Sequence, residues 1–261
     1  SSRLFGLSYP HLEPSNRHIA LFVQVPEMMA GGQIERRGLL VVAGATSLVT
    51  FSRQGASVVE RVPKAIAAVE GPGPFPVQTT CQLLKMVLDR NEHLVGQFEQ
   101  QLAVLEDLPV RESRPQFFEQ TFRLKKELSA AQSDLWRLRG VLRELAEGRV
   151  NLPGSNGTER PLLHDLAEAA DYLYETVNNI REGVLSLIDL HLNVVSFEMN
   201  RVMRVLAVVS VLGLIPAVVG GLFGMNLADN PWPFTLPQVT FAVGTAMIVC
   251  FYFFIVKGWL R

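Results

Sequence analysis

Residues 200–226 read NRVMRVLAVVSVLGLIPAVVGGLFGMN, and this stretch organises the rest of the chain. Between Val205 and Phe223 there is no charged side chain. A helix needs about 20 consecutive apolar residues to cross a hydrocarbon core about 30 Å thick. A second apolar run, Val239 to Val256, follows after a short loop. The sequence therefore predicts two membrane spans at its C-terminal end, behind a large polar region.

Composition separates the chain into two unlike parts. Of the 261 residues 48% are hydrophobic and 19% are charged, and almost all charges precede Arg204. The remaining stretch of roughly 200 residues is enough for one domain with a core or for two small ones. A net charge of −1 gives no global basicity, so no nucleic-acid partner is expected. Cys81 and Cys250 lie in unlike segments, which predicts neither a disulfide nor a zinc site.

The polar region begins with a strand-rich part, residues 1–76. Pro26 is expected to end the first strand, and residues 1–17 and 28–37 are expected to be irregular. β-Branched residues bounded by Gly and Pro support the strands. The expected strands are residues 18–25, two short strands within 38–51, and 57–62.

Residues 77–160 are predicted to form antiparallel helices. Apolar residues repeat at helical spacing over 77–107 and again over 116–147. The second of these helices carries many Arg and Lys side chains. We interpret them as a solvated helix face, in preference to a patch that binds nucleic acid or lipid. Residues 151–161 are rich in Gly, Ser and Asn and are typical of a linker.

A stalk helix is predicted over residues 161–204. Its apolar side chains recur every seven residues, which indicates a helix packed in a bundle or coiled coil. The two rows are Leu166, Leu173, Ile180, Leu187 and Val194, and Ala170, Val177, Val184 and His191. The helix is expected to continue to Phe223, a length of roughly 90 Å at 1.5 Å per residue. Since its own domain cannot cover so long a stripe, we expect a homo-oligomer.

Basic residues flank the two spans, which we place at residues 205–226 and 239–256. The loop between them, 227–238, contains no Lys or Arg. The positive-inside rule then places both termini and the tail 257–261 in the cytoplasm, and the loop in the periplasm. We expect a multi-pass protein of the bacterial inner (plasma) membrane. The flanking basic residues are Arg201, Arg204, Lys257 and Arg261.

Small residues recur at helical spacing in the first span. One explanation is close packing against another helix, and the other is a narrow pore wall around a symmetry axis. Both stay open. The second span is bulky and aromatic and is expected to face lipid. The small residues are Ser210, Gly213, Ala217, Gly220, Gly221 and Gly224.

Gly224-Met225-Asn226 after the first span, a short outer loop, a second span and a tail ending in Trp259-Leu260 resemble the CorA family of divalent metal-ion transporters. The segment from Asn200 through Met203 to Leu206 resembles the family's entrance to the pore helix, and the upstream layout matches along nearly the whole chain. This resemblance implies an α+β cytoplasmic domain, a long stalk helix and two C-terminal transmembrane helices. It also implies a homopentameric funnel.

The resemblance further implies a selectivity filter at Gly224, Met225 and Asn226, with the Asn226 carboxamides in a ring at the outer mouth. Amide oxygens suit the water shell of Mg²⁺, which loses water reluctantly. Met203 and Leu206 would form an apolar gate, for which ordinary helix packing is the simpler explanation without the resemblance. The implied pore-facing residues are Asn200, Met203, Leu206, Ser210, Leu214, Ala217 and Gly224.

Two departures leave the transported metal open. Ile215-Pro216-Ala217 stands where the family usually has Pro-Leu-Thr. The loop Leu-Ala-Asp-Asn-Pro-Trp at 227–232 lacks the common Met-Pro-Glu stretch and is closer to the ZntB branch. Zn²⁺ and Mg²⁺ or Co²⁺ therefore remain candidate substrates. Asp229 is the one outer acid, and it serves either to attract cations or to cap a turn.

Regulatory metal is a further possibility raised by the resemblance. Asp165 lies about where family members bind metal between cytoplasmic subunits, with Glu168 and Asp171 nearby. Solvated acids on a helix are the simpler explanation. His191 is expected to be a buried or water-bonded histidine, and the alternative is a Zn²⁺ ligand near the axis.

The main functional hypothesis is a divalent-cation channel or transporter. The alternative is a non-conducting two-span metal sensor or scaffold of the same fold. The sequence lacks a phosphate loop ending in Lys-Ser/Thr, HExxH and GxSxG, so an enzyme is not expected. Expected partners are further copies of the chain, membrane lipid and divalent metal ions, with no nucleic acid and no organic cofactor.

Overall fold

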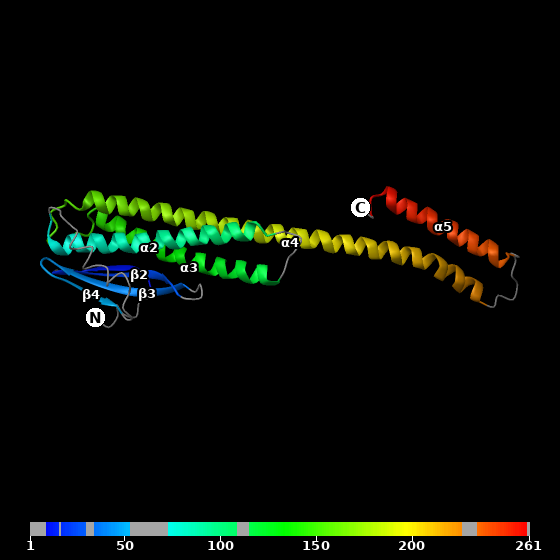
Figure 1. The fold of residues 1–261 in the computed structure, drawn as a ribbon, viewed down its shortest axis with the longest axis horizontal. Coiled ribbons are helices and arrows are strands. Elements are labelled where there is room, and N and C mark those ends of the chain that lie inside the picture. Colours follow the sequence, from blue (N-terminus) through cyan, green and yellow to red (C-terminus); the bar gives the residue numbers. More distant parts are fainter. Residues whose placement is uncertain are drawn as a thin grey trace. The chain divides into compact units, whose positions relative to one another are not determined.

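The computed structural model describes residues 9–15, 17–29, 34–52, 73–108, 115–225 and 234–259. Its contacts divide the chain into two compact units, Ser1–Ile188 (the first unit) and Asp189–Arg261 (the second unit). The expected strand at 57–62 lies outside the described residues. The elements, in chain order, are β1 (His11–Pro14), β2 (His18–Met28), β3 (Ile34–Gly44), β4 (Leu48–Ser52), α2 (Phe75–Glu106), α3 (Pro115–Ala146), α4 (Arg160–Gly224) and α5 (Leu236–Val256) (Figure 1).

The first unit begins with an antiparallel sheet whose strands pair in the order β1-β2-β3-β4. β2 does not end at Pro26, because Pro26 pairs with Arg36 and the ladder continues to Met28 opposite Ile34. The pairing of β1 with β2 runs from Ile19 to Phe22 and does not reach Pro26. Proline is tolerated in a strand at a position where the ladder does not need its missing N–H.

The sheet therefore corrects two sequence predictions. Residues 11–14 form β1 although 1–17 was expected to be irregular, and β3 begins at Ile34, inside the segment 28–37 that was expected to be irregular. The two short strands expected within 38–51 are confirmed in outline, as the end of β3 and as β4. Gly44 and Ala45 mark the turn between them, where the Gly44 N–H donates to the Ser47 carbonyl at 2.8 Å.

One face of the sheet packs against the helices of the first unit (Figure 1). Alternate β2 residues face this core, as the two-residue period of a strand requires. They are Ile19, Leu21, Val23 and Val25. Ala20 and Phe22 lie on the opposite face, in a small cluster with Leu40. The helix layer is thus continuous with the sheet through a single core.

The predicted helices at 77–107 and 116–147 are confirmed as α2 and α3. The helix bundle predicted from the stalk rows is confirmed over the first unit, whereas the expectation that the stripe needs further copies of the chain was wrong for this stretch. Every row member from Leu166 to Leu187 is buried in the same core as α2 and α3, without another copy of the chain. Gly183 contributes to this packing, because a Cβ there would lie 3.0 Å from Leu102 Cδ2. The heptad pattern in this stretch therefore arises from packing of α4 against α2 and α3 of the same chain.

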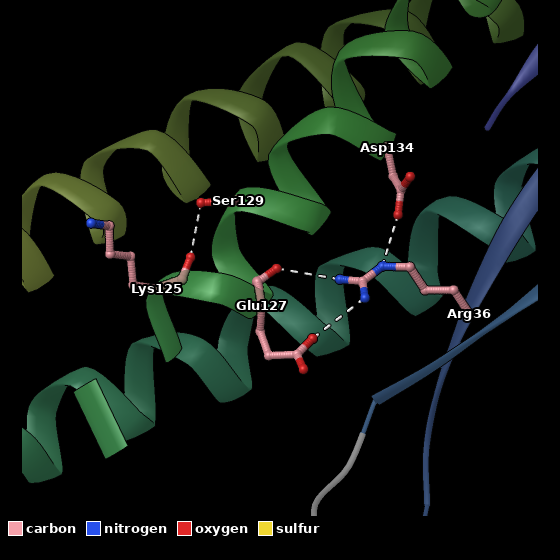
Figure 2. A network of polar contacts seen from close by, with 5 residues as sticks. All are labelled: Arg36, Lys125, Glu127, Ser129 and Asp134. Carbon is pink, nitrogen blue, oxygen red and sulfur yellow. Dashed lines mark hydrogen bonds and ion pairs between the residues drawn. The ribbon is translucent and has the colours of Figure 1, made fainter. Parts of the chain in front are cut away.

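An arginine on β3 links the sheet to α3. Arg36 Nε lies 2.8 Å from Asp134 Oδ2, and Arg36 Nη1 lies 3.4 Å from Glu127 Oε2. Arg36 Nη2 also donates to the Glu127 carbonyl at 3.3 Å, as Figure 2 shows. On the same helix, Ser129 Oγ donates to the Lys125 carbonyl at 2.9 Å (Figure 2). These contacts hold the helix layer in register with β3.

The second unit contains the end of α4 and all of α5. α4 is one helix from Arg160 to Gly224, with Pro216 inside it. Residues 236–238, expected in the loop, belong to α5, whose N-cap Thr235 and Gln238 form a capping box. α4 and α5 are each long and apolar enough to cross a membrane.

Candidate pore-lining face of α4

Within the second unit, α5 packs along one side of α4. Helix positions three and four apart share a side, and the less exposed positions of α4 follow this spacing. Val208 is 2% exposed, and Phe254 is the buried residue of α5. We call this side of α4 the seam; its members are Arg204, Val208, Leu212, Ile215 and Val219.

A cavity of about 410 Å³ lies between the outer halves of the two helices. Ile215, Val219 and Phe223 line it from α4, and Val239 and Ala242 are among the α5 residues opposite. Its lining is almost entirely apolar, apart from Gln238. This hollow belongs to the α4–α5 contact and offers no acidic ligand to a cation.

The sequence-predicted pore residues lie on another side of α4. Each is exposed, and each follows the previous one by three or four positions. At about 100° per residue, this line falls roughly opposite the seam. Three of its apolar members, Met203, Leu206 and Leu214, are more than half exposed. We call it the open line; it consists of Asn200, Met203, Leu206, Ser210, Leu214 and Ala217.

The glycines near the open line have no packing role within the described chain. A Cβ added at Gly213, Gly220, Gly221 or Gly224 meets no heavy atom of the described residues within 4 Å, beyond the helix's own backbone. Contact with α5 therefore does not explain them. The space that they leave lies outside the chain, where a neighbouring helix or a solvent path is still a possible occupant.

The outer end of the site is described only in part. α4 ends at Gly224, and Met225 follows it as an exposed residue. Asn226 and Asp229, the two outer residues for which metal contact was predicted, lie outside the described residues. The structure thus brings six predicted pore residues onto one side of one helix, next to the first two residues of the predicted filter.

Of the three acids near the start of the stalk helix, Asp165 and Glu168 are exposed and Asp171 is half-buried. Glu168 Oε1 lies 3.4 Å from His164 Nε2. Asp171 Oδ1 lies 3.3 Å from Arg139 Nε, and its other oxygen pairs with Arg143. Across the described ranges no three His, Cys, Asp or Glu side chains are grouped to hold a metal ion.

His191 is buried, at 1% exposure, as the simpler explanation of this residue predicted. The sequence analysis used Arg204 only to orient the spans and did not predict that this residue is partly buried. Arg204 lies on the seam, and its Nε is shielded from solvent without a hydrogen-bond partner in the described part of the chain. Its spacing of four residues from Val208 and eight from Leu212 places the three on one side of a helix, but the sequence does not show that this side meets α5.

Comparison with known proteins identifies curated relatives. The cobalt/magnesium transport proteins CorA of Thermotoga maritima and Methanocaldococcus jannaschii are each 26% identical to this chain, over 181 and 183 residues. Each alignment covers 68% of this chain, and 51% and 56% of the respective relative. The chain thus spans about half the length of the curated relatives it matches.

Solved structures of similar fold extend over both units. The CorA magnesium transporter from M. jannaschii has a TM-score of 0.80 at 20% identity, covering 98% of this chain and 84% of that one. Full-length CmaX has a TM-score of 0.76 at 21% identity, covering 94% and 77%. The ZntB cytoplasmic domain from Vibrio parahaemolyticus has a TM-score of 0.58 at 14% identity, covering 70% and 72%.

The predicted architecture of an α+β domain, a long helix and a C-terminal helix pair is therefore confirmed as a CorA-like fold. A family model described as CorA-like Mg²⁺ transporter protein matches residues 6–257, which include both candidate spans. The chain belongs to the CorA family.

Proposed function

We propose that this chain is one subunit of a homopentameric channel that carries divalent cations across a membrane. The open line on α4 is the observation that carries the proposal. Lipid can cover its apolar side chains, but the line also carries the polar Asn200 and Ser210 and lies beside glycines that meet no other atom of the described chain. Further copies of α4 around an axis would cover these positions. The family membership and the names of the two curated relatives support cation transport.

Five copies of the open line would line the path with polar and apolar rings in a fixed order. Asn200 forms a polar ring at the inner end, followed by apolar rings of Met203 and Leu206. Apolar constrictions close a pore by losing their water. Ser210 restores a hydroxyl beyond them, and the filter of Gly224, Met225 and Asn226 completes the outer end.

The proposed filter is neutral, and this suits conduction. Carboxamide oxygens can hold the waters of a hydrated cation without the strong attraction of a carboxylate, and conduction needs sites that release the ion. Asp229, outside the filter, raises the local concentration of cations. The membrane potential drives entry, because a charge of +2 gains about 4.6 kcal/mol per 100 mV.

We propose Mg²⁺ and Co²⁺ as the first substrates, a choice that the family description and the relatives' names support. Zn²⁺ is the competitor, because residues 227–232 resemble the ZntB branch. In this proposal the first unit lies in the cytoplasm of a bacterium, with both termini on that side of the inner membrane. A regulatory metal at Asp165 would take its other ligands from a neighbouring copy.

Flux through liposomes that contain the purified full-length chain tests the proposal. Mg²⁺, Co²⁺, Ni²⁺ and Zn²⁺ are compared on one preparation, for the wild type, Asn226→Ala and the control Asn230→Ala. The control removes the same side chain four residues further along the loop. We expect Asn226→Ala to abolish flux or its selectivity and Asn230→Ala to retain both. A wild type without flux, whose subunit packing still responds to metal, would indicate the sensor or scaffold instead.

A further inference from the structure

The end of the α4–α5 pair that lies away from the outer loop carries basic side chains from both helices. Figure 1 shows α5 running back alongside the last part of α4. Arg204 lies as many residues before Gly224, the last residue of α4, as Val256 lies after Leu236, the first residue of α5. Because both helices rise about 1.5 Å per residue, Arg204 and the end of α5, where Lys257 is the C-cap, each lie roughly 30 Å along their helix from its outer end.

Arg204 is held in the seam but not neutralised there. Its Nε is buried and has no hydrogen-bond partner among the described residues. Its guanidinium lies 6.0 Å from the ring centroid of Phe197, two turns earlier on α4. The side chain thus extends away from the apolar run, as a basic residue does when its stem packs on apolar surface and its head reaches the membrane boundary.

Lys257 is placed by a well-formed helix end. The Gly258 N–H donates to the Ile255 carbonyl at 3.0 Å and the Trp259 N–H to the Phe254 carbonyl at 3.1 Å. With φ of +72° at Gly258, this is a Schellman motif. The Trp259 ring packs at 5.4 Å from Phe254, the buried residue of α5. The last turn is therefore held by Trp259 on Phe254, and the exposed Lys257 side chain projects from its end.

Acidic residues are few near this end, and the nearest in sequence is Glu198, three positions before Arg201 on α4. From Met199 to Arg261 the sequence contains a single acid, Asp229. Asp229 follows α4 at the opposite end of the helix pair, beyond the apolar span. Glu198 neighbours Arg201 on the helix surface, whereas Arg204 and Lys257 have no acidic residue three or four positions away.

We propose that Arg204 and Lys257 form a binding site for the phosphate of an anionic glycerophospholipid. A guanidinium suits phosphate because its planar fork donates two hydrogen bonds at once. The exposed apolar side chains of Phe253 and Val256, just before Lys257 on α5, provide the adjoining surface on which the acyl chains begin. A bound lipid would clamp the two helices on the side of α4 roughly opposite the open line, and so would leave the proposed path clear.

This inference rests on the membrane position of α4 and α5 and not on cation transport. Its test is native mass spectrometry of the full-length assembly. The protein is incubated in detergent with phosphatidylglycerol or with phosphatidylcholine, and the lipid that stays bound is measured. The wild type is expected to retain phosphatidylglycerol in preference to phosphatidylcholine. Since one basic residue near an anionic surface contributes about 1 kcal/mol, Arg204→Gln should weaken phosphatidylglycerol binding about fivefold.

Two further variants separate a specific site from a general loss of charge or fold. Arg204→Lys keeps the charge but loses the planar fork, so its affinity should lie between those of the wild type and Arg204→Gln. Arg123→Gln removes an exposed charge from α3 in the first unit and should retain the lipid fully. The melting temperature in lipid-free detergent shows whether each variant is folded.

Several outcomes would overturn the site. Equal phosphatidylglycerol retention by the wild type and folded Arg204→Gln removes Arg204 from it. Displacement of the lipid by inorganic phosphate at equal concentration identifies a soluble anion as the ligand. Equal retention of the two lipids shows that the phosphate-bearing anionic headgroup is not selected. Cation flux is measured separately, so its absence contradicts the proposed function and leaves the lipid site standing.

Discussion

Arg36 on β3 and Asp134 on α3 are joined by an ion pair in which Nε and Oδ2 are 2.8 Å apart. Both side chains are largely buried, at 20% and 19% exposure. Burial raises the pKa of the Asp134 carboxyl, although the Arg36 charge and hydrogen bond and the Arg137 charge act in the opposite direction. Asp134 is therefore kept ionised at neutral pH with the help of Arg36, at a cost in desolvation.

The two partners of this pair should differ in mutational cost. Arg36→Gln leaves a buried carboxylate without its cation and should lower the free energy of unfolding by about 1–3 kcal/mol at pH 7. Asp134→Asn removes the desolvation cost together with the pair and should cost less. Melting temperatures of the purified chain in detergent measure both, and the control Arg123→Gln should cost under about 1 kcal/mol.

The pH dependence has a definite sign. Since the folded pKa of Asp134 lies above the ordinary value of 3.8, the folded state binds this proton more tightly. Its contribution to stability is present at low pH and falls as the pH rises through that window. The deficit of Arg36→Gln should shrink on acidification toward pH 4. A larger cost for Asp134→Asn than for Arg36→Gln at pH 7 would contradict this account.

Cys81 should be inert in the folded protein. Burial raises the pKa of its thiol from 9.0 to about 12, with a smaller contribution from the Glu159 carboxylate. The thiolate, which is the reactive form, is then scarce at pH 8. In a Cys250→Ala background, we expect maleimide to label Cys81 only after unfolding, as mass spectrometry would measure.

Rapid labelling of folded Cys81 at pH 8 would contradict the position of this residue in the core. The pH dependence of stability gives a second check on the Cys81 thiol. The proton held by the folded thiol contributes stability that is lost as the pH rises from about 9 toward 12. Cys81→Ala should flatten the loss of stability in that range, although it also costs core volume at every pH.

The helices could be predicted well because their signals are local and repeated. Apolar spacing located α2 and α3, and one uninterrupted pattern predicted that α4 continues into the first span. The short strand β1 could not be predicted in this way, because His11–Pro14 has no distinctive alternation and is defined by its pairing with β2. The prediction that the strand ends at Pro26 was wrong for a related reason. A proline ends a strand only where a neighbouring strand needs the N–H that proline lacks.

The spacing of an apolar stripe also does not show which surface buries it. Leu173 and Ile180 repeat as they would in an oligomer, yet they are buried by the chain's own helices. The open line was predicted from the family resemblance, and the structure adds that α5 occupies another side. Arg204 could not be assigned to the seam from sequence alone, because that requires knowing which side of α4 meets α5.

The proposed gate makes a prediction about resting leak. Leu206 lies on the open line and is more than half exposed within one chain. Leu206→Thr places a hydroxyl in the apolar constriction, which favours water there and should raise divalent leak. A barrier lowered by about 1.4 kcal/mol would increase the leak about tenfold. Fluorescent-indicator liposomes measure it in the absence of a membrane potential.

Val209→Thr is the matched control for this gate. Val209 is also exposed, but it lies between the open line and the seam. Thr at this position likewise adds a hydroxyl to an exposed apolar site on α4, without entering the proposed path. Equal leak in the two variants would identify a general effect on the helix and would remove Leu206 from the gate.

Accessibility of Ser210 to a thiol reagent during transport tests the central claim most directly. In a Cys81→Ala and Cys250→Ala background that still transports, Ser210→Cys and Val209→Cys are treated with a water-soluble methanethiosulfonate while Mg²⁺ flux is recorded. The account predicts that the reagent blocks flux through Ser210→Cys, that Mg²⁺ slows this block, and that Val209→Cys continues to conduct. Undiminished flux after complete labelling of Ser210→Cys would contradict a path along this side of α4.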